Sequence, residues 1–359
     1  MERRSFLKKA AIGASAGAIA APALAQSLPT LNWRLASSFP KTLDTVFGAS
    51  ETFCKRVGQL TGGKLNIRAF AGGEIVPALQ VMDAVQAETI EMGHTAPYYY
   101  FGKDPTFAFD CAVPFGLNSR QQTAWMDHGG GMALLREFYK DYGIIQFQGG
   151  NSGTQMGGWF RKEIKSVADM QGLKMRVGGY GGRVLQRLGV VPQQIAAGDI
   201  YPALEKGTID AAEWIGPHDD EKLGLYKVAP YYYTPGWWEP STQFSFYVGI
   251  KTWEKLPKEY QYAIETASYE AHVTMQASYD AQNPVALARL LRNGVKLRSF
   301  SKEIMEACYK ATTEVNEEEA SKNPKFKKIY EPWKRFRQDA NQWFSVAEAP
   351  LQNFMISRK

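Results

Sequence analysis

Short apolar segments alternate with amphipathic ones along the first 150 residues. The apolar segments have the length and the β-branched and aromatic content of strands, and the segments between them carry apolar residues at helical spacing. The candidate strands are residues 31–36, 64–70, 91–95 and 144–147. The candidate helices are residues 44–60, 77–88 and 119–139. Strands and helices that alternate in this way predict an α/β unit built on a parallel, doubly wound sheet.

A glycine-rich segment, residues 148–153, separates this unit from a second one of the same kind. Glycine adopts backbone angles that other residues avoid, so we interpret this segment as a hinge. The candidate strands beyond it are residues 156–160, 173–177 and 211–214. The candidate helices are residues 165–170, 183–188 and 199–206.

The pattern in the last third of the chain predicts that the backbone passes between the two units more than once. Residues 243–250 form an apolar strand that leads back to the first unit, and residues 295–299 form a late strand. Residues 259–291 predict a helix with a break near Asn283-Pro284, and a helix of ~25 residues would span ~37 Å, enough to run behind both units. Two amphipathic helices follow, over residues 302–320 and 326–344.

These crossings predict an α/β fold with two lobes, hinge connections, a long helix that spans both lobes, and a ligand between them. The predicted boundaries are residues 27–150 with about 241–285 for lobe I, residues 151–240 with about 286–322 for lobe II, and residues 323–359 for a C-terminal helix.

The first 26 residues have the pattern of an export signal and are set aside from the fold. Arg3 and Arg4 precede Phe-Leu-Lys, a weakly apolar stretch rich in small residues follows, and Ala23-Leu-Ala25 fits a cleavage site. The pattern predicts export to the periplasm by the twin-arginine (Tat) pathway, with cleavage near Ala25. A signal anchor is disfavoured, because the apolar stretch is short and rich in alanine and glycine.

Charge and cysteine content exclude several classes of function. The net charge is +6, of which the export signal supplies +3, and no basic block indicates nucleic-acid binding. Cys54, Cys111 and Cys308 are odd in number and far apart, so we expect buried free thiols rather than a disulfide framework. The four histidines are scattered, which argues against zinc.

Residues 176–240 concentrate glycine, tryptophan and acidic residues. Arg176 ends a predicted strand, where its guanidinium can hold a carboxylate through two parallel hydrogen bonds; the alternative is a surface ion pair. The glycines of residues 178–182 lack the spacing of a nucleotide-binding loop. We expect them to allow close approach, either to a ligand or at a helix N-terminus that favours an anion.

Glu213 and Glu239 each lie beside a tryptophan, and carboxylates in apolar surroundings are costly unless they are paired or bound to a metal. With the amide oxygen of Gln155 they could hold a hard cation such as Ca²⁺ or Na⁺. A structural salt bridge is one alternative. Paired-carboxylate catalysis, as in glycosidases, is another, although no other catalytic motif supports it.

Two aromatic segments are candidate pocket walls. Residues 96–102 follow a predicted strand, and ligands of open α/β sheets bind beyond the carboxyl ends of strands, although this loop could equally pack on its own domain. Tyr231 to Tyr233 and Trp237-Trp238 are interleaved with polar residues, which favours a pocket floor. Asp219 to Glu221 is more typical of a solvated helix start than of a metal site.

Several stretches together resemble one family, the solute-binding receptors of tripartite ATP-independent periplasmic (TRAP) transporters. They are Arg176-Val-Gly-Gly, Leu188-Gly-Val-Val-Pro192, residues 199–207, Asp210-Ala-Ala-Glu-Trp-Ile-Gly-Pro217 and Tyr231-Tyr-Tyr-Thr-Pro-Gly-Trp-Trp-Glu-Pro240. The resemblance covers nearly the whole chain after the export signal. It is closest to the branch that binds 2-oxo acids or lactate with a metal ion.

The resemblance implies a periplasmic-binding-protein-like receptor that closes on a small carboxylate and delivers it to a membrane permease without catalysis. Arg176 would clamp the carboxylate. Glu213, the backbone oxygen of Trp214, Glu239 and Gln155 would ligate Na⁺ or Ca²⁺, and the cation would bind the 2-oxo or 2-hydroxy oxygen. The substrate-binding residues implied are Gln155, Arg176, Tyr99, Tyr100, Trp214 and Trp238.

The resemblance also implies a homodimer in which the C-terminal helix, residues 325–355, is exchanged between subunits. Two other functions stay open at this point. One is a secreted hydrolase that uses Glu213 and Glu239, and the other is a ligand sensor that docks on a receptor kinase.

Overall fold

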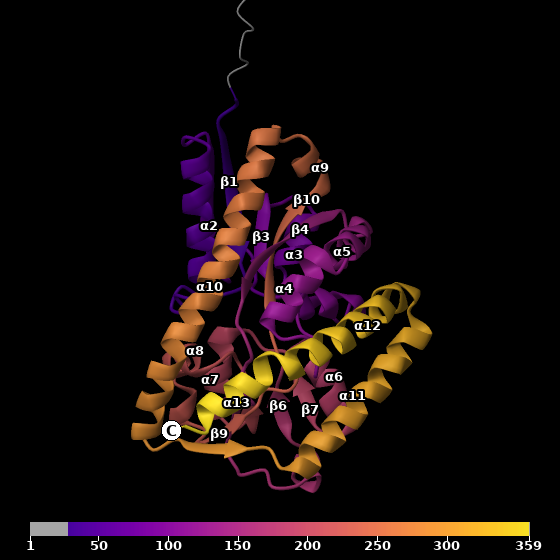
Figure 1. The fold of residues 1–359 in the computed structure, drawn as a ribbon. Coiled ribbons are helices and arrows are strands. Elements are labelled where there is room, and N and C mark those ends of the chain that lie inside the picture. The colour runs from indigo at the N-terminus through magenta and orange to yellow at the C-terminus, as the bar shows by residue number, and fades with distance from the viewer. Residues whose placement is uncertain (1–27, 359) are drawn as a thin grey trace, which may run out of the picture.

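Two β-sheets, each flanked by helices, form the two lobes of the molecule (Figure 1). The computed structural model describes residues 28–358, so the predicted export signal and its cleavage site lie outside the described residues. Within this range, no helix is long and apolar enough to cross a membrane. Cys54, Cys111 and Cys308 are free thiols, as expected; Cys111 and Cys308 are buried, whereas Cys54 is only half-buried.

Lobe I is built on a five-stranded sheet with the order β2-β1-β3-β10-β4. Its strands are β1 (Leu31–Ser37), β2 (Leu65–Phe70), β3 (Met92–Thr95), β4 (Ile144–Asn151) and β10 (Gln243–Gly249). Strand β1 runs parallel to β2 and β3, whereas β10 is antiparallel to β3 and β4. The predicted return of residues 243–250 to the first unit is confirmed, and this return adds antiparallel pairs to the predicted parallel sheet.

The two helices predicted over residues 44–60 and 77–88 are present in lobe I, whereas α9 (Ile250–Glu254) and two 3₁₀ helices were not predicted. The helices of this lobe are α2 (Val46–Leu60), α3 (Val81–Gln86), α4 (Ser119–His128), α5 (Gly131–Lys140) and α9, with the short 3₁₀ helices η1 (Pro97–Tyr100) and η2 (Pro105–Asp110). The single helix predicted over residues 119–139 is wrong. Gly130 has a left-handed φ of 87°, and a Cβ on Gly131 would lie 2.7 Å from the Trp125 ring, so the chain turns there and starts a new helix.

Lobe II is built on a six-stranded sheet with the order β11-β9-β5-β8-β6-β7. Its strands are β5 (Trp159–Phe160), β6 (Lys174–Arg176), β7 (Val191–Gln193), β8 (Ala211–Ala212), β9 (Tyr231–Thr234) and β11 (Lys296–Ser299). Its helices are η3 (Val167–Met170), α6 (Gly179–Arg187), α7 (Ala197–Glu205), α8 (Pro217–Leu223) and η4 (Leu225–Lys227). The boundaries of the lobes along the chain stay a prediction.

Some residues that the sequence predicted at the pocket floor or in solvent are buried in the core of lobe II. The Tyr232 ring stacks on Trp159 with 3.9 Å between ring centroids, and its hydroxyl donates to Asp220 at 2.7 Å. This tyrosine is therefore core rather than pocket floor. Asp219 and Asp220 do start α8, but they are buried rather than solvated, because tyrosine hydroxyls supply their hydrogen bonds; Tyr279 donates to Asp219 at 2.7 Å.

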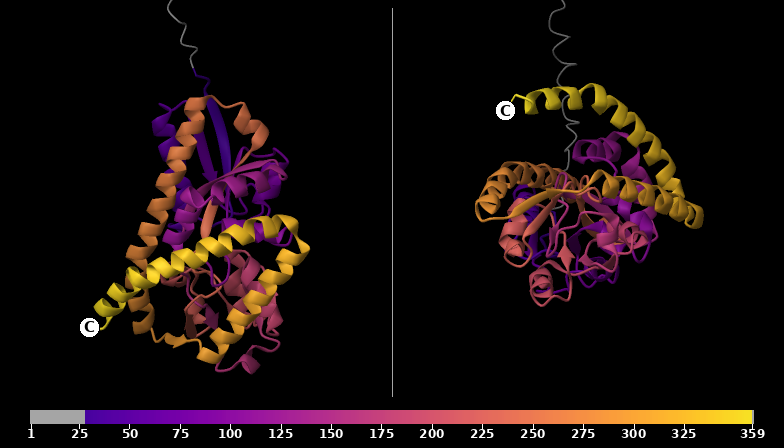
Figure 2. Two further views of the ribbon diagram at one scale, coloured as in Figure 1. Left: turned by 45° about the vertical axis from the view of Figure 1, so that its right-hand side comes forward. Right: turned by 90° about the horizontal axis from the view of Figure 1, so that it is seen from below.

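Helix α10 (Lys258–Arg292) runs along both lobes, and Figures 1 and 2 show it passing from the top of lobe I to the base of lobe II. It packs on α2 and β4 in lobe I and on α8 in lobe II. The predicted break near Asn283-Pro284 is wrong. Pro284 removes one backbone hydrogen bond, but Asn283 accepts from the backbone N–H of His218 and Arg289 pairs with Glu221, which holds this end of the helix against α8.

The chain ends in three helices, α11 (Lys302–Lys322), α12 (Pro324–Val346) and α13 (Glu348–Ile356). Helix α11 packs on α6 of lobe II, whereas α12 returns over η2, α4 and α5 of lobe I. The view from below in Figure 2 shows the end of α12 and α13 projecting from the body. Apolar side chains there are exposed: Trp343, Val346, Leu351, Phe354, Met355 and Ile356.

Candidate ligand and cation site

Arg176 and Glu213 lie side by side at one edge of the lobe II sheet. Strand β6 ends at Arg176, and its parallel neighbour β8 ends at Ala212, with Arg176 opposite Ala212 in the register. Both side chains are completely buried and form an ion pair through Nη1 of the arginine. Nη1 also donates to the backbone oxygen of Glu213 at 2.8 Å, and Nε donates to that of Ile195 at 3.1 Å. Nη2 has no partner within the described chain.

The glycines at the start of α6 serve this pair, and because α6 begins at Gly179, only Gly178 of the predicted glycine loop lies before the helix. The backbone N–H of Gly178 donates to Glu213 Oε1 at 2.8 Å, the same oxygen that faces Arg176. The Tyr98 ring packs so closely on the loop that a Cβ on Gly178 would lie 2.4 Å from it. The close approach predicted for these glycines is therefore made to a tyrosine, and the anion near the helix start is the Glu213 carboxylate.

Glu239 and Gln155 are joined by the hydroxyl of Thr242. Thr242 Oγ1 donates to Glu239 Oε2 at 2.5 Å and accepts from Gln155 Nε2 at 2.8 Å. The backbone N–H of Gln155 also donates to the backbone oxygen of Glu239 at 3.1 Å. These bonds orient both side chains and leave Glu239 Oε1 and Gln155 Oε1 buried without a partner.

Among residues 28–358, the buried site holds two carboxyl groups, Glu213 and Glu239, but only one cationic side chain, Arg176. Burial and the nearby Glu213 raise the pKa of Glu239 well above its ordinary value, against the opposing effects of Thr242 and Arg176. Burial also raises the pKa of Glu213, although Arg176 and the Gly178 N–H oppose it. For Arg176, burial disfavours the charge and is the largest single influence, but Glu213, Tyr99, Tyr98 and Glu239 together outweigh it and hold its pKa above the usual range. Two buried carboxylates thus face one guanidinium, and a cation bound between them would remove the imbalance.

Aromatic rings from both lobes close over the guanidinium. Arg176 Cζ lies 4.9 Å from the centre of the Trp214 ring, an arrangement that favours the charge. Phe39, in the loop after β1 of lobe I, packs edge-on against Trp214 at 6.4 Å between centroids and lies 6.5 Å from Tyr99. Burial raises the pKa of Tyr99, and the charges that act on it include Arg176, Glu213 and Glu239.

The structure does not bring every predicted residue to this group. The Tyr100 hydroxyl points into lobe I, where it accepts from the backbone N–H of Met82 at 2.9 Å and lies 3.2 Å from Thr95 Oγ1. The Trp238 ring packs edge-on against Trp237 and Phe300 in lobe II, and its Nε1 is buried without a partner, so a role at the site stays a prediction. The residues brought together are Gln155, Arg176, Glu213, Trp214, Glu239 and Tyr99.

Two residues at the site, Phe39 and Thr242, were missed by sequence reasoning, and Tyr98 was expected only as part of the aromatic segment 96–102. Phe39 carries a usable signal, because it directly follows a strand that runs parallel to its neighbours, where ligands of α/β sheets bind. Tyr98 lies in a run of three tyrosines, and only the 3₁₀ geometry of η1 decides which of them faces lobe II. The sequence offers no signal for Thr242.

The buried polar atoms without a partner indicate which kinds of ligand suit this site. Buried polar atoms are almost always hydrogen-bonded, yet five lie here without a partner. Three are oxygens, Glu213 Oε2, Glu239 Oε1 and Gln155 Oε1, the ligand type that Na⁺ and Ca²⁺ prefer. Two are donors, Arg176 Nη2 and Trp214 Nε1, which suit a carboxylate.

The unpartnered side-chain acceptors at the site are all oxygens. Residues 28–358 contain no group of three or more His, Cys, Asp and Glu side chains placed to hold a metal ion. A cation at this site would therefore need amide, backbone and ligand oxygens in addition to the two carboxylates. The sequence-based expectation of Na⁺ or Ca²⁺ rather than zinc fits these residues.

The chain is similar in sequence to known solute-binding proteins. The model of bacterial extracellular solute-binding protein family 7 matches residues 36–323. A monocarboxylate 2-oxoacid-binding periplasmic protein from Nostoc sp. is 50% identical over 363 residues, which cover 99% of this chain and 100% of that protein.

Two solved structures extend the comparison. A TRAP transporter solute-binding protein from Bordetella bronchiseptica is 56% identical, with a TM-score of 0.91 over 92% of this chain and 98% of that one. It is a mixed-occupancy dimer with copurified calcium and picolinate in one active site and an apo site. A TRAP periplasmic solute-binding protein from Pseudoalteromonas atlantica, with bound sodium and pyruvate, is 39% identical, with a TM-score of 0.88 over 90% and 99% of the two chains.

Proposed function

This chain belongs to family 7 of the bacterial extracellular solute-binding proteins, the periplasmic receptors of TRAP transporters, and from that premise we propose that it binds a small 2-oxo or 2-hydroxy monocarboxylate together with a cation. The receptor would deliver this acid to the TRAP permease in the membrane. The observation that carries the proposal is the set of buried, unpartnered atoms around Arg176, in which oxygens and nitrogen donors occur together.

The ligand class follows from chemistry shared by the ligands of two relatives. Pyruvate has a ketone oxygen on the carbon next to its carboxylate, and picolinate has a ring nitrogen in the same place. Each can therefore chelate one cation through a carboxylate oxygen and the neighbouring atom, in a five-membered ring. Lactate has a hydroxyl at this position. The chain would accept acids with such a donor atom and reject simple fatty acids, which lack it.

Each side chain then has a separate role. When bound, Na⁺ or Ca²⁺ supplies the positive charge that lets two carboxylates and an acid share one buried site. Glu213, Glu239, Gln155 and the backbone oxygen of Trp214 would hold the cation. Arg176 would donate to the ligand carboxylate through Nη2 while Nη1 stays with Glu213. Thr242 fixes the orientations of Glu239 and Gln155.

We propose no catalysis. Arg176 and the Gly178 N–H occupy Glu213 Oε1, and the remaining carboxylate oxygens without a partner, Glu213 Oε2 and Glu239 Oε1, are assigned to the cation rather than to a reacting proton. The family is one of solute receptors, and none of the relatives described above is a hydrolase or a kinase-linked sensor. The alternatives based on paired-carboxylate hydrolysis and on a receptor kinase therefore lack support.

Export and assembly complete the proposal. The twin arginines Arg3 and Arg4 support export by the Tat pathway, with cleavage near Ala25. A homodimer through the C-terminal helices is supported by the exposed apolar residues of α12 and α13, since such a surface usually marks an interface. The Bordetella relative is a dimer.

Mass spectrometry of the protein purified under native conditions tests the ligand class. We expect a small 2-oxo or 2-hydroxy acid, together with sodium or calcium, to be released on denaturation. Pyruvate and lactate added to ligand-stripped protein should bind, whereas propionate of the same carbon number should not. Binding of propionate with equal affinity, or conversion of a bound acid into a product, would contradict the proposal.

A further inference from the structure

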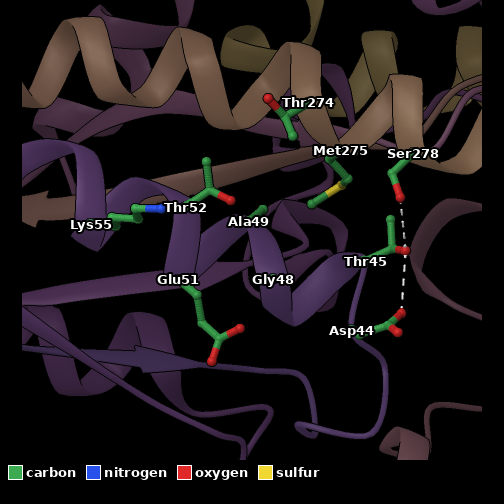
Figure 3. Close-up of a pocket in the computed structure, with 10 residues that line it drawn as sticks. All are labelled: Asp44, Thr45, Gly48, Ala49, Glu51, Thr52, Lys55, Thr274, Met275 and Ser278. Carbon is green, nitrogen blue, oxygen red and sulfur yellow. Dashed lines mark hydrogen bonds between the residues drawn. The ribbon is translucent and has the colours of Figure 1, made fainter.

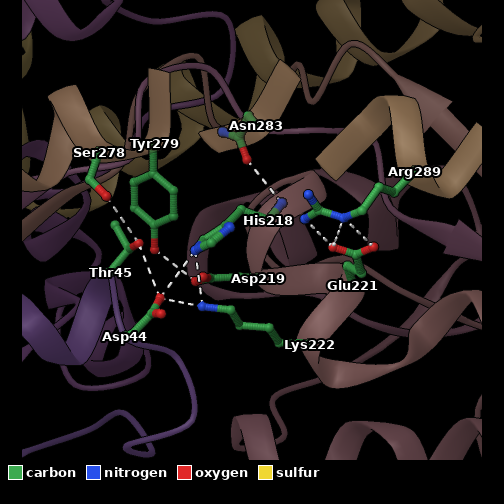
Figure 4. A network of polar contacts seen from close by, with 10 residues as sticks. All are labelled: Asp44, Thr45, His218, Asp219, Glu221, Lys222, Ser278, Tyr279, Asn283 and Arg289. Atoms are coloured by element: carbon green, nitrogen blue, oxygen red, sulfur yellow. Dashed lines mark hydrogen bonds and ion pairs between the residues drawn. The ribbon is translucent and has the colours of Figure 1, made fainter. Parts of the chain in front are cut away.

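The two lobes are also joined by a polar cluster outside the ligand site (Figure 4). Asp44 lies two residues before the start of α2 in lobe I. His218 Nε2 lies 3.1 Å from Asp44 Oδ1, and Lys222 Nζ forms an ion pair with the same oxygen. His218 and Lys222 are four residues apart on α8 of lobe II and therefore lie on one face of that helix. Their side chains contact each other at 3.0 Å.

Helix α10 holds both halves of this cluster in place. Ser278 Oγ lies 3.3 Å from the hydroxyl of Thr45, the residue that follows Asp44. On the lobe II side, Tyr279 donates to Asp219, and Asn283 Oδ1 accepts from the backbone N–H of His218 at 3.0 Å. The start of α2 and the start of α8 are thus each tied to the same helix, which brings Asp44 opposite His218 and Lys222.

We propose that Asp44, His218 and Lys222 form a clasp between the lobes that slows the release of bound ligand. Arg176, Glu213 and Trp214 come from lobe II, whereas Phe39 and Tyr99 come from lobe I, so ligand can leave only when the lobes separate. The clasp joins the same two lobes and must break in that step. A contact present only in the closed state lowers the release rate and leaves the association rate nearly unchanged.

The exposure of the clasp suits a contact that must open repeatedly. The Asp44 side chain is 67% exposed and that of Lys222 is 27% exposed. A cavity of about 320 Å³ between α2 and α10 is lined by Asp44, Thr45 and Ser278, so the cluster borders solvent (Figure 3). Exposed ion pairs contribute little and are screened by salt. The expected effect on the release rate is therefore about two- to fivefold.

Release kinetics of the variant Asp44→Asn test the clasp. With pyruvate and Ca²⁺ as ligands, stopped-flow tryptophan fluorescence should show release about two- to fivefold faster than in the unmodified protein, with the association rate unchanged. Raising the salt concentration should speed release from the unmodified protein more than from the variant. The matched control is Glu91→Gln, which removes the ion pair of Arg34 and Glu91 within lobe I and should not change release.

A double-mutant cycle separates the clasp from an unspecific loss of stability. Once Asp44→Asn is present, adding Lys222→Met should accelerate release no further, because both changes remove one contact. Equal release rates for Asp44→Asn and the unmodified protein, or fully additive effects, would overturn the clasp.

The clasp rests on the proposed function only because the kinetic test uses pyruvate and Ca²⁺ as ligands. If the unmodified protein binds no pyruvate, the proposed function fails, and the clasp is then tested without ligand by small-angle X-ray scattering. A larger radius of gyration for Asp44→Asn than for Glu91→Gln supports the clasp, and equal radii contradict it.

Discussion

Arg176 uses Nε and Nη1 inside the protein and leaves Nη2 buried without a partner. The sequence left open whether this arginine makes a structural ion pair or binds a ligand carboxylate. The structure contains the ion pair, with Glu213, and its geometry keeps one donor available beside it. A guanidinium is suited to both tasks at once, because its five N–H groups point in fixed and different directions.

Phe39 is expected to limit the length of the bound acid. Its ring lies near those of Tyr99 and Trp214, and the Trp214 ring lies against the Arg176 guanidinium. Phe39→Ala should therefore raise the affinity for 2-oxopentanoate relative to pyruvate by about tenfold or more, since each methylene accommodated is worth ~1–3 kcal/mol. Isothermal titration calorimetry of both acids measures this ratio.

Phe39→Leu serves as the control, because leucine refills much of the space and should restore the original preference. The alanine variant should also unfold more easily, by ~3–5 kcal/mol, so its folding must be checked by circular dichroism. An unchanged ratio in a folded Phe39→Ala protein would show that the ring does not face the carbon chain of the ligand.

At the scale of secondary structure, the sequence predicted the elements that carry the two main site residues. Apolar strands followed by polar residues are readable, and parallel strands end at the same edge of a sheet, so Arg176 and Glu213 could be placed together. Gln155 and Glu239 were expected at the site from their oxygen chemistry, and the family resemblance implied the same residues. Their link through Thr242 depends on loop conformation, which no periodic pattern records.

The elements that were wrongly predicted failed for physical reasons. Successive residues of a 3₁₀ helix point about 120° apart, so the orientations of Tyr98, Tyr99 and Tyr100 could not be assigned from the sequence. Pro284 usually ends a helix, but tertiary contacts to α8 hold this one. Asp219 has the pattern of a solvated helix start, and only the fold reveals that Tyr279 covers it.

The Asp219–Tyr279 contact between α8 and α10 should make stability depend on pH. Burial raises the pKa of Asp219 to about 7, with Asp220 adding to the shift and Tyr279 opposing it. Between pH ~4 and 7 the unfolded chain loses this proton while the folded protein keeps it, so stability falls as pH rises through this range. Asp219→Asn cannot ionise and should remove this loss.

Urea unfolding of Asp219→Asn at pH 4.5 and pH 8 measures the effect. We expect a gain over the unmodified protein of the order of 1–4 kcal/mol at pH 8 and little difference at pH 4.5. Asp339→Asn, at an exposed position on α12, controls for the loss of one carboxylate from the chain. A destabilised Asp219→Asn protein at pH 8 would show that Asp219 is ionised in the folded state.

At the scale of the whole molecule, the end of α12 and α13 project from the two lobes and are not needed to enclose a ligand (Figure 2). Leu351 and Phe354 on α13 are 65% and 52% exposed. If this surface forms the proposed dimer, the double variant Leu351→Asp with Phe354→Asp should be monomeric, because buried charges at an interface are costly. Size-exclusion chromatography with light scattering gives the mass directly.

Val285→Asp is the matched control, since Val285 is an exposed apolar residue that belongs to α10 rather than to α12 or α13. This variant should keep the mass of the unmodified protein. A monomeric unmodified protein, or a dimer that survives the double substitution on α13, would contradict assembly through these helices.

The central claim is that a cation and a small 2-oxo acid share the buried site formed by Arg176, Glu213, Glu239 and Gln155. The direct measurement is calorimetric titration of pyruvate into protein that has been stripped of ligand and chelator-treated, in a buffer with potassium as its only metal cation. We predict no binding in this buffer and recovery of binding when either Ca²⁺ or Na⁺ is added. Pyruvate binding of equal strength with and without these ions would contradict the account.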